Sequence, residues 1–235
     1  MWTKSIEFNK CWNPNVLSFL NIFYNLKYKL NYKMTTLIFQ ITLTEKNATD
    51  YDLPKEFLDE IYLLLKHFDE FCDKHNIQYW VDGGTMLGCM RERGQIPYDN
   101  DADVGVFEDA YNKILSLKEE LSSEPFNYVF KEETFGCFKI LSRNVAIQTS
   151  EEVIISPCLD IFMYKEFKDL IIIANEDFRR KFPKCYHMRL DFHPFIKAPY
   201  KDLELSCVNN PLPYLNRQYP NWWNTFIYDH KIYSS

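Results

Sequence analysis

The chain has 235 residues, enough for one substantial domain with a small appendage. Its hydrophobic fraction of 46% and charged fraction of 26% are ordinary for a globular protein, and its formal net charge of -6 excludes a general electrostatic attraction to nucleic acid. The 7 cysteines show no CxxC or zinc-knuckle spacing, so they indicate buried thiols in a reducing compartment rather than a disulfide scaffold.

Residues 1–50 are predicted to be a leader that precedes the main domain, which we place at residues 51–235. Leu, Ile, Phe and Tyr are frequent over residues 16–43, but Lys27, Lys29 and Lys33 interrupt them. No apolar run therefore approaches the roughly 18–20 residues that a membrane span needs. The leader is at most a weak candidate anchor, and membrane association stays open.

The main domain opens with an amphipathic helix, predicted over residues 53–74. Pro54 suits a first helical turn, where its missing N–H is not needed. Apolar side chains then recur at helical spacing from Phe57 to Phe71, with charged residues on the other face. A lone histidine on a helix is usually a surface or satisfied core residue, so His67 and His75 receive no chemical role.

A short strand over residues 77–81 is predicted to end at a glycine turn, with a short helix over residues 85–92. Glycine lets the backbone turn sharply and lets a ligand approach the main chain closely. The N-terminus of a helix offers N–H groups and a positive dipole end, which suit phosphate. Gly83, Gly84, Thr85 and the later Arg91 are therefore candidate phosphate-binding residues. Taken alone this signal is weak, because many tight turns have the same composition.

The next strand, predicted over residues 101–106, presents two acids. Asp101 and Asp103 alternate with apolar residues, so both project from the same face of the strand. Two carboxylates that close repel each other unless a cation lies between them. Oxygen ligands favour a hard ion such as Mg²⁺. The alternative is a solvated acidic turn before a strand, but the neighbouring glycine turn favours a site.

A third acid lies further along the chain. We predict a helix over residues 108–122, strands over residues 126–131 and 137–147 joined by a turn at 134–136, and a strand over residues 158–164 with 170–174 as its hairpin partner. Asp160 is the lone acid in an apolar strand, where a charge needs a partner or a metal. If that strand neighbours the strand of Asp101 and Asp103, the three carboxylates share one metal site, with Asp160 placed as a general base. Otherwise Asp160 is an edge-strand residue that faces water.

Beyond Asn175 the pattern loosens, and several prolines predict irregular structure. The basic cluster Arg179, Arg180, Lys181 and Lys184 either meets an anionic substrate or is a solvated face. Residues 214–223 are predicted to form a short helix followed by packed aromatic side chains.

Several of these motifs together resemble the LicD family, which includes bacterial phosphocholine transferases and the catalytic domains of fukutin and fukutin-related protein. The resemblance lies in Tyr79 to Gly88, Arg91, Gly94, Pro97 to Gly105, Leu159 to Phe162, and Tyr214 to Trp222. It spans roughly residues 53–230 and leaves residues 1–50 uncovered. The departures are Tyr98 where the family commonly has Trp, Asn100 where an acid is frequent, and Ala102 where a branched residue is usual. None of them removes a proposed metal ligand.

The resemblance implies an α+β nucleotidyltransferase-like fold, with a mixed β-sheet flanked by α-helices. It implies transfer of a phospho-alcohol, of the phosphocholine or ribitol phosphate type, from a CDP-activated donor to a glycan hydroxyl. Gly83, Gly84 and Thr85 would line the donor phosphates and Arg91 would contact them. Asp101 and Asp103 would hold Mg²⁺ or Mn²⁺, and Asp160 would complete the site or activate the acceptor hydroxyl.

Two other functions remain open at this point. One is a nucleotidyltransferase that uses an NTP, and the other is an inactive domain that binds a glycan or a partner. The compartment is open too, because the cysteines slightly favour the cytoplasm whereas fukutin-like relatives act in the secretory pathway.

Overall fold

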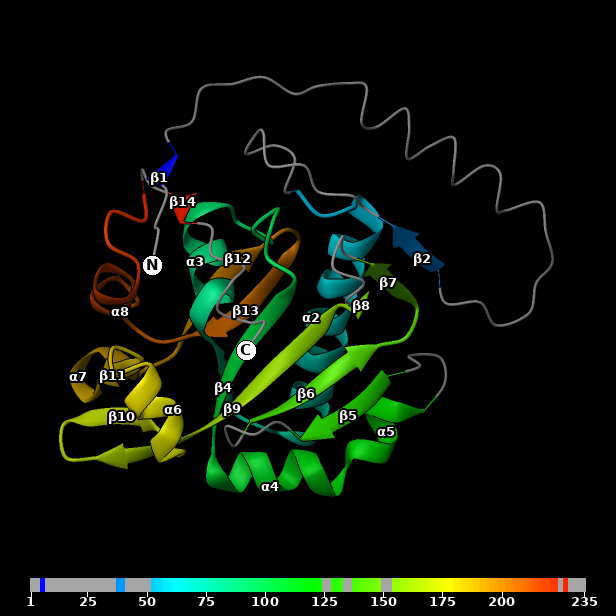
Figure 1. Ribbon diagram of the computed structural model, residues 1–235. Helices are drawn as coiled ribbons and strands as arrows, with labels where there is room; N and C mark the ends of the chain where they lie inside the picture. The colour runs from blue at the N-terminus through cyan, green and yellow to red at the C-terminus, as the bar shows by residue number, and fades with distance from the viewer. Residues whose placement is uncertain are drawn as a thin grey trace.

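The computed structural model describes residues 5–6, 37–40, 52–123, 128–132, 137–148, 154–223 and 226–227 (Figure 1). Most of the predicted leader and the turn predicted at residues 134–136 lie outside these described residues. What is described is a mixed β-sheet with helices packed on it, as the α+β prediction requires. None of the helices in the described part of the chain is both long and apolar enough to cross a membrane.

Within the described residues, the main sheet has seven strands in the order β11–β10–β9–β4–β3, with β6 also paired to β9 and β5 paired to β6. These strands are β3 (Tyr79–Val81), β4 (Asp101–Phe107), β5 (Tyr128–Glu132), β6 (Cys137–Ser142), β9 (Cys158–Phe167), β10 (Leu170–Ile173) and β11 (Tyr186–Met188). The neighbours β4 and β9 run parallel, and the other pairs in this sheet are antiparallel. The strand of Asp160 is therefore a direct neighbour of the strand of Asp101 and Asp103.

One face of the sheet is apolar and is covered by helices. The helix α2 (Lys55–His75) contacts β4, β6 and β9 with the apolar stripe that its sequence predicted (Figure 1). Its end is fixed by Asn76, whose left-handed φ of 51° closes the last turn. The helix α4 (Glu108–Ser116) covers the same face, where Tyr111 packs edge-on against Phe138.

Two predicted elements are divided in the structure. The helix predicted over residues 108–122 breaks at Leu117 into α4 and α5 (Lys118–Ser122). The strand predicted over residues 137–147 divides into β6 and β7 (Val145–Gln148), and β7 joins β2 (Leu37–Gln40) and β8 (Ile154–Ile155) in a second sheet. The buried Glu60 carboxylate fixes the connection between β6 and β7, because it accepts hydrogen bonds from Ser142 (2.6 Å) and Asn144 (2.8 Å).

The expectation of irregular structure beyond Asn175 is wrong. This region contains α6 (Glu176–Lys181), β11, α7 (Arg189–Phe192), a hairpin of β12 (Ile196–Tyr200) and β13 (Leu203–Cys207), and α8 (Leu212–Gln218), and β1 (Ser5–Ile6) pairs with β14 (Phe226–Ile227). Pro199 fits inside β12 because each strand of a two-stranded hairpin has an open edge, where a missing N–H costs no ladder hydrogen bond. Pro199 therefore marks an edge strand here, not the absence of a strand.

The second face of the main sheet carries the polar groups. Alternation along β4 and β9 places Asp101, Asp103, Cys158 and Asp160 on this face, near the start of both strands. Further along, the same face becomes aromatic around the buried Trp80, which packs against Phe107, Tyr164 and Phe192. The acids thus lie at one end of a rigid, packed surface.

Candidate functional site

The centre of the candidate site is the parallel pairing of β4 with β9. In this register Asp101 lies opposite Cys158, and Asp103 lies opposite Asp160. Opposed residues on adjacent strands project from the same face, so the pairing brings the three predicted carboxylates together. Asp101 and Asp160 are buried, which excludes the alternative of an edge-strand Asp160 that faces water.

Cys158 joins this group of acids, although the sequence analysis did not select it. One carboxylate oxygen of Asp101, one of Asp160 and the Cys158 sulfur all lie within 4.8 Å of one another. All three residues are buried. Burial and the carboxylates of Asp160 and Asp101 raise the pKa of the Cys158 thiol well above its ordinary value. These three side chains could hold a metal ion.

A lysine partly neutralises the acids. Lys139 lies opposite Asp160 on β6, and its ammonium nitrogen donates to Asp160 Oδ2 at 2.7 Å. The same nitrogen lies 3.9 Å from the Cys158 sulfur. Burial disfavours the charge of Lys139, but the nearby Asp160, Cys158 and Asp101 outweigh it and raise the lysine pKa. The site therefore already holds one cationic group.

The glycine turn is built directly against Asp103. Gly83 begins α3 (Gly83–Arg91) with a left-handed φ of 45°, which a residue with a side chain rarely adopts. A Cβ atom on Gly83 would collide with Asp103 Oδ2, and one on Gly84 would collide with Asp99 Oδ2. The Gly84 N–H donates to Asp103 Oδ2 at 2.9 Å, and the Asp103 N–H donates to Thr85 Oγ1 at 2.7 Å. Hydrogen bonds and close contacts thus hold the glycine turn in a fixed position against β4.

Asp99 adds a further carboxylate that was not predicted. The loop that carries it is fixed by Gln95, whose side-chain amide donates to the carbonyl oxygens of Asp99 and Asp101, both at 2.9 Å. Burial, followed by the nearby Asp101, raises the pKa values of Asp99 and of Asp103 well above their ordinary value. This concentration of negative charge favours bound protons or a bound cation.

Behind the turn lies a buried polar network centred on Asp82. Its Oδ2 accepts a hydrogen bond from the Tyr164 hydroxyl, and its Oδ1 lies 3.3 Å from His187 Nε2. The His187 ring stacks on Tyr214 with ring centroids 4.4 Å apart. Burial would raise the pKa of Asp82, but His187, Tyr164 and the Gly83 backbone N–H lower it below its ordinary value. The network ties β11 and α8 to the glycine turn.

Arg91 lies at the far end of α3 and contacts other protein groups. Its guanidinium donates to Glu92 (2.8 Å), to the Trp222 carbonyl (3.3 Å) and to the Tyr98 hydroxyl (3.4 Å). The basic cluster on α6 contacts its own surroundings: Arg179 donates to the carbonyls of Ile173 and Ala174, and Arg180 pairs with Glu176 and Asp177.

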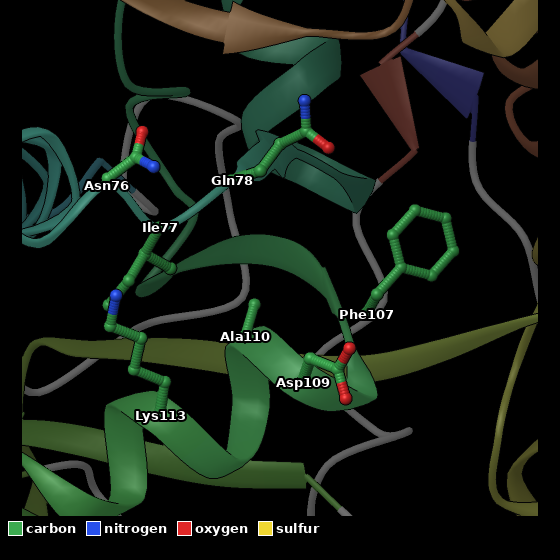
Figure 2. Close-up of a pocket in the computed structure, with 7 residues that line it drawn as sticks. All are labelled: Asn76, Ile77, Gln78, Phe107, Asp109, Ala110 and Lys113. Carbon is green, nitrogen blue, oxygen red and sulfur yellow. The ribbon is translucent and has the colours of Figure 1, made fainter.

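A separate cavity lies at the opposite end of β4. It has a volume of about 260 Å³ and is lined by Asn76, Ile77, Gln78, Phe107, Asp109, Ala110 and Lys113. Figure 2 shows these residues on the α2–β3 connection, at the end of β4 and on the first turns of α4. Phe107 follows Asp101 by six residues, roughly 20 Å along a strand. This cavity is therefore not part of the acidic face.

One of the missed residues carried a usable signal in the sequence. Lys139 is a lone lysine between Phe138 and Ile140 in an apolar strand, the counterpart of the lone acid Asp160. His187 carried none, because its partner Asp82 is distant in sequence and His187 itself lies in the region beyond Asn175 that was expected to be irregular.

Comparison with known proteins places this geometry in context. Residues 76–210 match the model of a family described as LicD/FKTN/FKRP, nucleotidyltransferase domain. An uncharacterized protein of Rickettsia prowazekii is 27% identical over 182 residues, which cover 77% of this chain and 62% of that protein. The lipopolysaccharide cholinephosphotransferase LicD of Haemophilus influenzae is 27% identical over 106 residues, which cover 43% of this chain and 40% of that protein.

A human relative and one solved structure complete the comparison. The ribitol-5-phosphate transferase FKTN of Homo sapiens is 24% identical over 64% of this chain and 30% of that protein. The crystal structure of an antigenic nucleotidyltransferase-like protein from Paracoccidioides brasiliensis is similar with a TM-score of 0.35 and 13% identity, covering 64% of this chain and 61% of that one. The chain spans between 30% and 62% of the lengths of these three curated relatives.

Proposed function

Because the chain belongs to the LicD/FKTN/FKRP family of nucleotidyltransferase domains, we propose that it transfers a phospho-alcohol from a CDP-activated donor to a glycan hydroxyl. The phospho-alcohol would be of the phosphocholine or ribitol phosphate type, as the names of two relatives suggest. The observation that carries the proposal is the register of β4 with β9, which gathers Asp101, Asp103 and Asp160 beside the Gly83–Gly84 turn.

The donor atoms of this face suit a divalent cation. Several carboxylates lie on one face of the sheet, and two of them share a group of close ligand atoms with Cys158. We propose that Asp101, Asp103 and Asp160 hold Mg²⁺ or Mn²⁺ there. Such an ion, when bound, supplies positive charge to the oxygens of the transferred phosphate.

The glycine turn supports a phosphate beside these acids. Since neither Gly83 nor Gly84 has room for a Cβ atom, the backbone comes as close as it can to Asp103 and Asp99. We propose that Gly83, Gly84 and Thr85 line the donor phosphates at this position. Arg91 would reach the phosphates only by leaving Tyr98 and the Trp222 carbonyl, which makes its role the weakest of the four.

The reaction also needs an acceptor for the proton of the attacking hydroxyl. The hydroxyl oxygen forms the new P–O bond, the bond between the transferred phosphorus and the bridging oxygen breaks, and CMP leaves with that oxygen. We assign the proton to Asp99, which lies beside Gly84 and is not among the three proposed metal ligands, because burial and the neighbouring carboxylates raise its pKa. Asp160 is the poorer base, since its ion pair with Lys139 stabilises the carboxylate.

The test is nucleotide release by the purified chain with Mg²⁺ and a glycan acceptor. CDP-choline, CDP-ribitol and CDP-glycerol are offered in parallel with CTP and ATP, and CMP is measured. We expect CMP from at least one CDP-alcohol and no pyrophosphate from either NTP. Pyrophosphate release from an NTP would instead indicate a nucleotidyltransferase.

The matched variants are Asp103→Asn and Asp109→Asn. Both remove one carboxylate near an end of β4, but Asp109 lines the remote cavity. We expect Asp103→Asn to abolish CMP release and Asp109→Asn to keep it. Full turnover by Asp103→Asn would overturn the assignment of the site.

A further inference from the structure

We propose that Cys158 completes a mixed oxygen–sulfur cation site with Asp101 and Asp160, and that this site binds thiophilic ions such as Zn²⁺ and Cd²⁺ more tightly than Mg²⁺. The inference rests on the cation centre of the proposed function and deepens it. It assigns that centre a sulfur ligand, which increases the preference for such ions beyond what carboxylates alone confer.

The strand register puts Cys158 in position to be a ligand. It lies opposite Asp101 across the β4–β9 pair and two residues before Asp160 on the same strand, so all three side chains share one face. Their ligand atoms lie within 4.8 Å of one another, and each residue is at least nine-tenths buried. A cation among these atoms would be surrounded by protein donors rather than by water.

Lys139 already places one positive group beside the proposed ligands. Its ammonium nitrogen lies 2.7 Å from Asp160 Oδ2 and 3.9 Å from the Cys158 sulfur. Two of the three proposed ligands therefore already face a positive group. A divalent ion that binds there competes with the lysine for Asp160.

Asp103 serves a different part of the acidic face. Its Oδ2 accepts the N–H of Gly84 at 2.9 Å, and it is not among the three residues whose ligand atoms come together. The face therefore has a part with only oxygen donors, formed by Asp99 and Asp103 beside the glycine turn, and a part that contains sulfur. Mg²⁺ makes little use of a thiolate, so only the oxygen donors of the face contribute to binding it.

Sulfur increases the preference of the site for thiophilic metals. Thiolates favour zinc-like ions, and a thiol that coordinates a metal loses its proton, which passes to solvent. Zn²⁺ or Cd²⁺ therefore gains from Cys158 an interaction that Mg²⁺ does not. Mg²⁺ must rely on the carboxylates, so the two kinds of ion should respond differently to loss of the thiol.

The test is a titration of the purified full chain with Cd²⁺ in the absence of nucleotide. Cadmium–thiolate bonds give an ultraviolet charge-transfer band, and we expect one equivalent to produce it. Cys158→Ser should lose the band and weaken Cd²⁺ binding more than about tenfold. Cys185→Ser, which removes a partly exposed thiol, and Cys11→Ser, outside the described residues, should keep both.

Two further measurements keep the outcome decisive. Lys139→Met should bind Cd²⁺ more tightly, because the competing ammonium is gone. Cadmium NMR of the unaltered protein reports a sulfur ligand directly, so the result does not depend on whether Cys158→Ser folds. A resonance in the all-oxygen range, or a charge-transfer band that survives in Cys158→Ser, would overturn the inference.

Failure of this inference and failure of the proposed function are distinguishable. The cadmium experiments contain no donor and measure only ligation, whereas the proposed function is measured as CMP release with Mg²⁺. A sulfur-ligated Cd²⁺ without CMP release supports the cation site and removes the transferase. CMP release together with Cd²⁺ that is bound only by oxygen atoms supports the transferase and rules out the sulfur-containing cation site.

Discussion

Asp103 lies directly opposite Asp160 across the parallel strands β4 and β9, about one strand spacing of 4.8 Å apart. Neighbouring like charges of this kind destabilise a folded chain unless protons or cations neutralise them. In this protein Lys139 neutralises Asp160, whereas one Asp103 oxygen accepts the Gly84 N–H and the pKa of Asp103 is raised well above its ordinary value. In the metal-free site, repulsion between the neighbouring carboxylates therefore lowers the stability of the folded chain. This loss of stability can be measured.

The first prediction concerns pH. Asp103 and Asp99 have pKa values raised well above 3.8 in the folded chain. Between the ordinary pKa of the unfolded chain and these raised values, the folded state binds protons that the unfolded state has lost from these two carboxyl groups. Their contribution to the free energy of unfolding therefore falls as pH rises from about 4 through their folded pKa values. Denaturation by urea in EDTA should show this decline in the wild type and a shallower one in Asp103→Asn.

The comparison between wild type and Asp103→Asn isolates this contribution from those of the histidines. Saturating Mg²⁺ should flatten the wild-type curve, because a bound cation replaces the protons. A wild type whose stability runs parallel to that of Asp103→Asn at every pH would contradict the prediction.

The second prediction concerns Lys139. Lys139→Met removes the ammonium group that pairs with the buried Asp160 carboxylate. Breaking a fully buried pair costs about 3–5 kcal/mol, and the partial exposure of Lys139 reduces this to about 1–3 kcal/mol for the metal-free protein. Thermal unfolding in EDTA and in Mg²⁺ measures the loss and the expected recovery by the metal.

Lys131→Met is the control for Lys139→Met. Lys131 lies opposite Lys139 on β5 and is exposed, so its replacement should change the unfolding free energy by no more than about 0.5 kcal/mol. Equal effects of the two substitutions would show that the charge beside Asp160 does not matter.

The third prediction concerns the network behind the glycine turn. His187→Leu leaves the buried Asp82 carboxylate with the Tyr164 hydroxyl but without its ring partner, and should cost about 3 kcal/mol. The double variant Asp82→Asn/His187→Leu should cost less than the sum of the two single changes, because the unpaired charge is gone. Urea unfolding measures all three variants, with the exposed His193→Gln as control. Strict additivity would rule out the pairing.

The fourth prediction concerns the turn. Gly84→Ala would place a methyl group against Asp99 Oδ2 and should displace the acids while the fold survives. A displacement of about 1 Å in a site can cost about 100-fold in turnover. Gly94→Ala is the matched control, because the nearest atom to its new Cβ would be Lys201 Cγ at an ordinary 3.5 Å. CMP release together with circular dichroism separates lost chemistry from lost fold, and normal turnover by Gly84→Ala would count against a site at this turn.

The sequence by itself determined the elements whose signals are local. The apolar stripe of α2, the glycine turn before α3 and the same-face placement of Asp101 and Asp103 follow from helical spacing, from glycine chemistry and from strand alternation. Those rules involve residues that are close in the chain. The glycine turn and the strand with Asp101 and Asp103 also contain the motifs that resemble the family whose model matches residues 76–210.

Only the tertiary structure decided which distant residues meet. Asp160 was expected near the other acids only if its strand adjoined theirs, and the β4–β9 pairing supplied that condition. Lys139 and Cys158 were in the sequence too, but their proximity depends on the pairing of β6 with β9 and on the register of β9 with β4. A shift of one residue in that register would turn these side chains to the apolar face, so the site exists because packing of the whole sheet fixes the alignment.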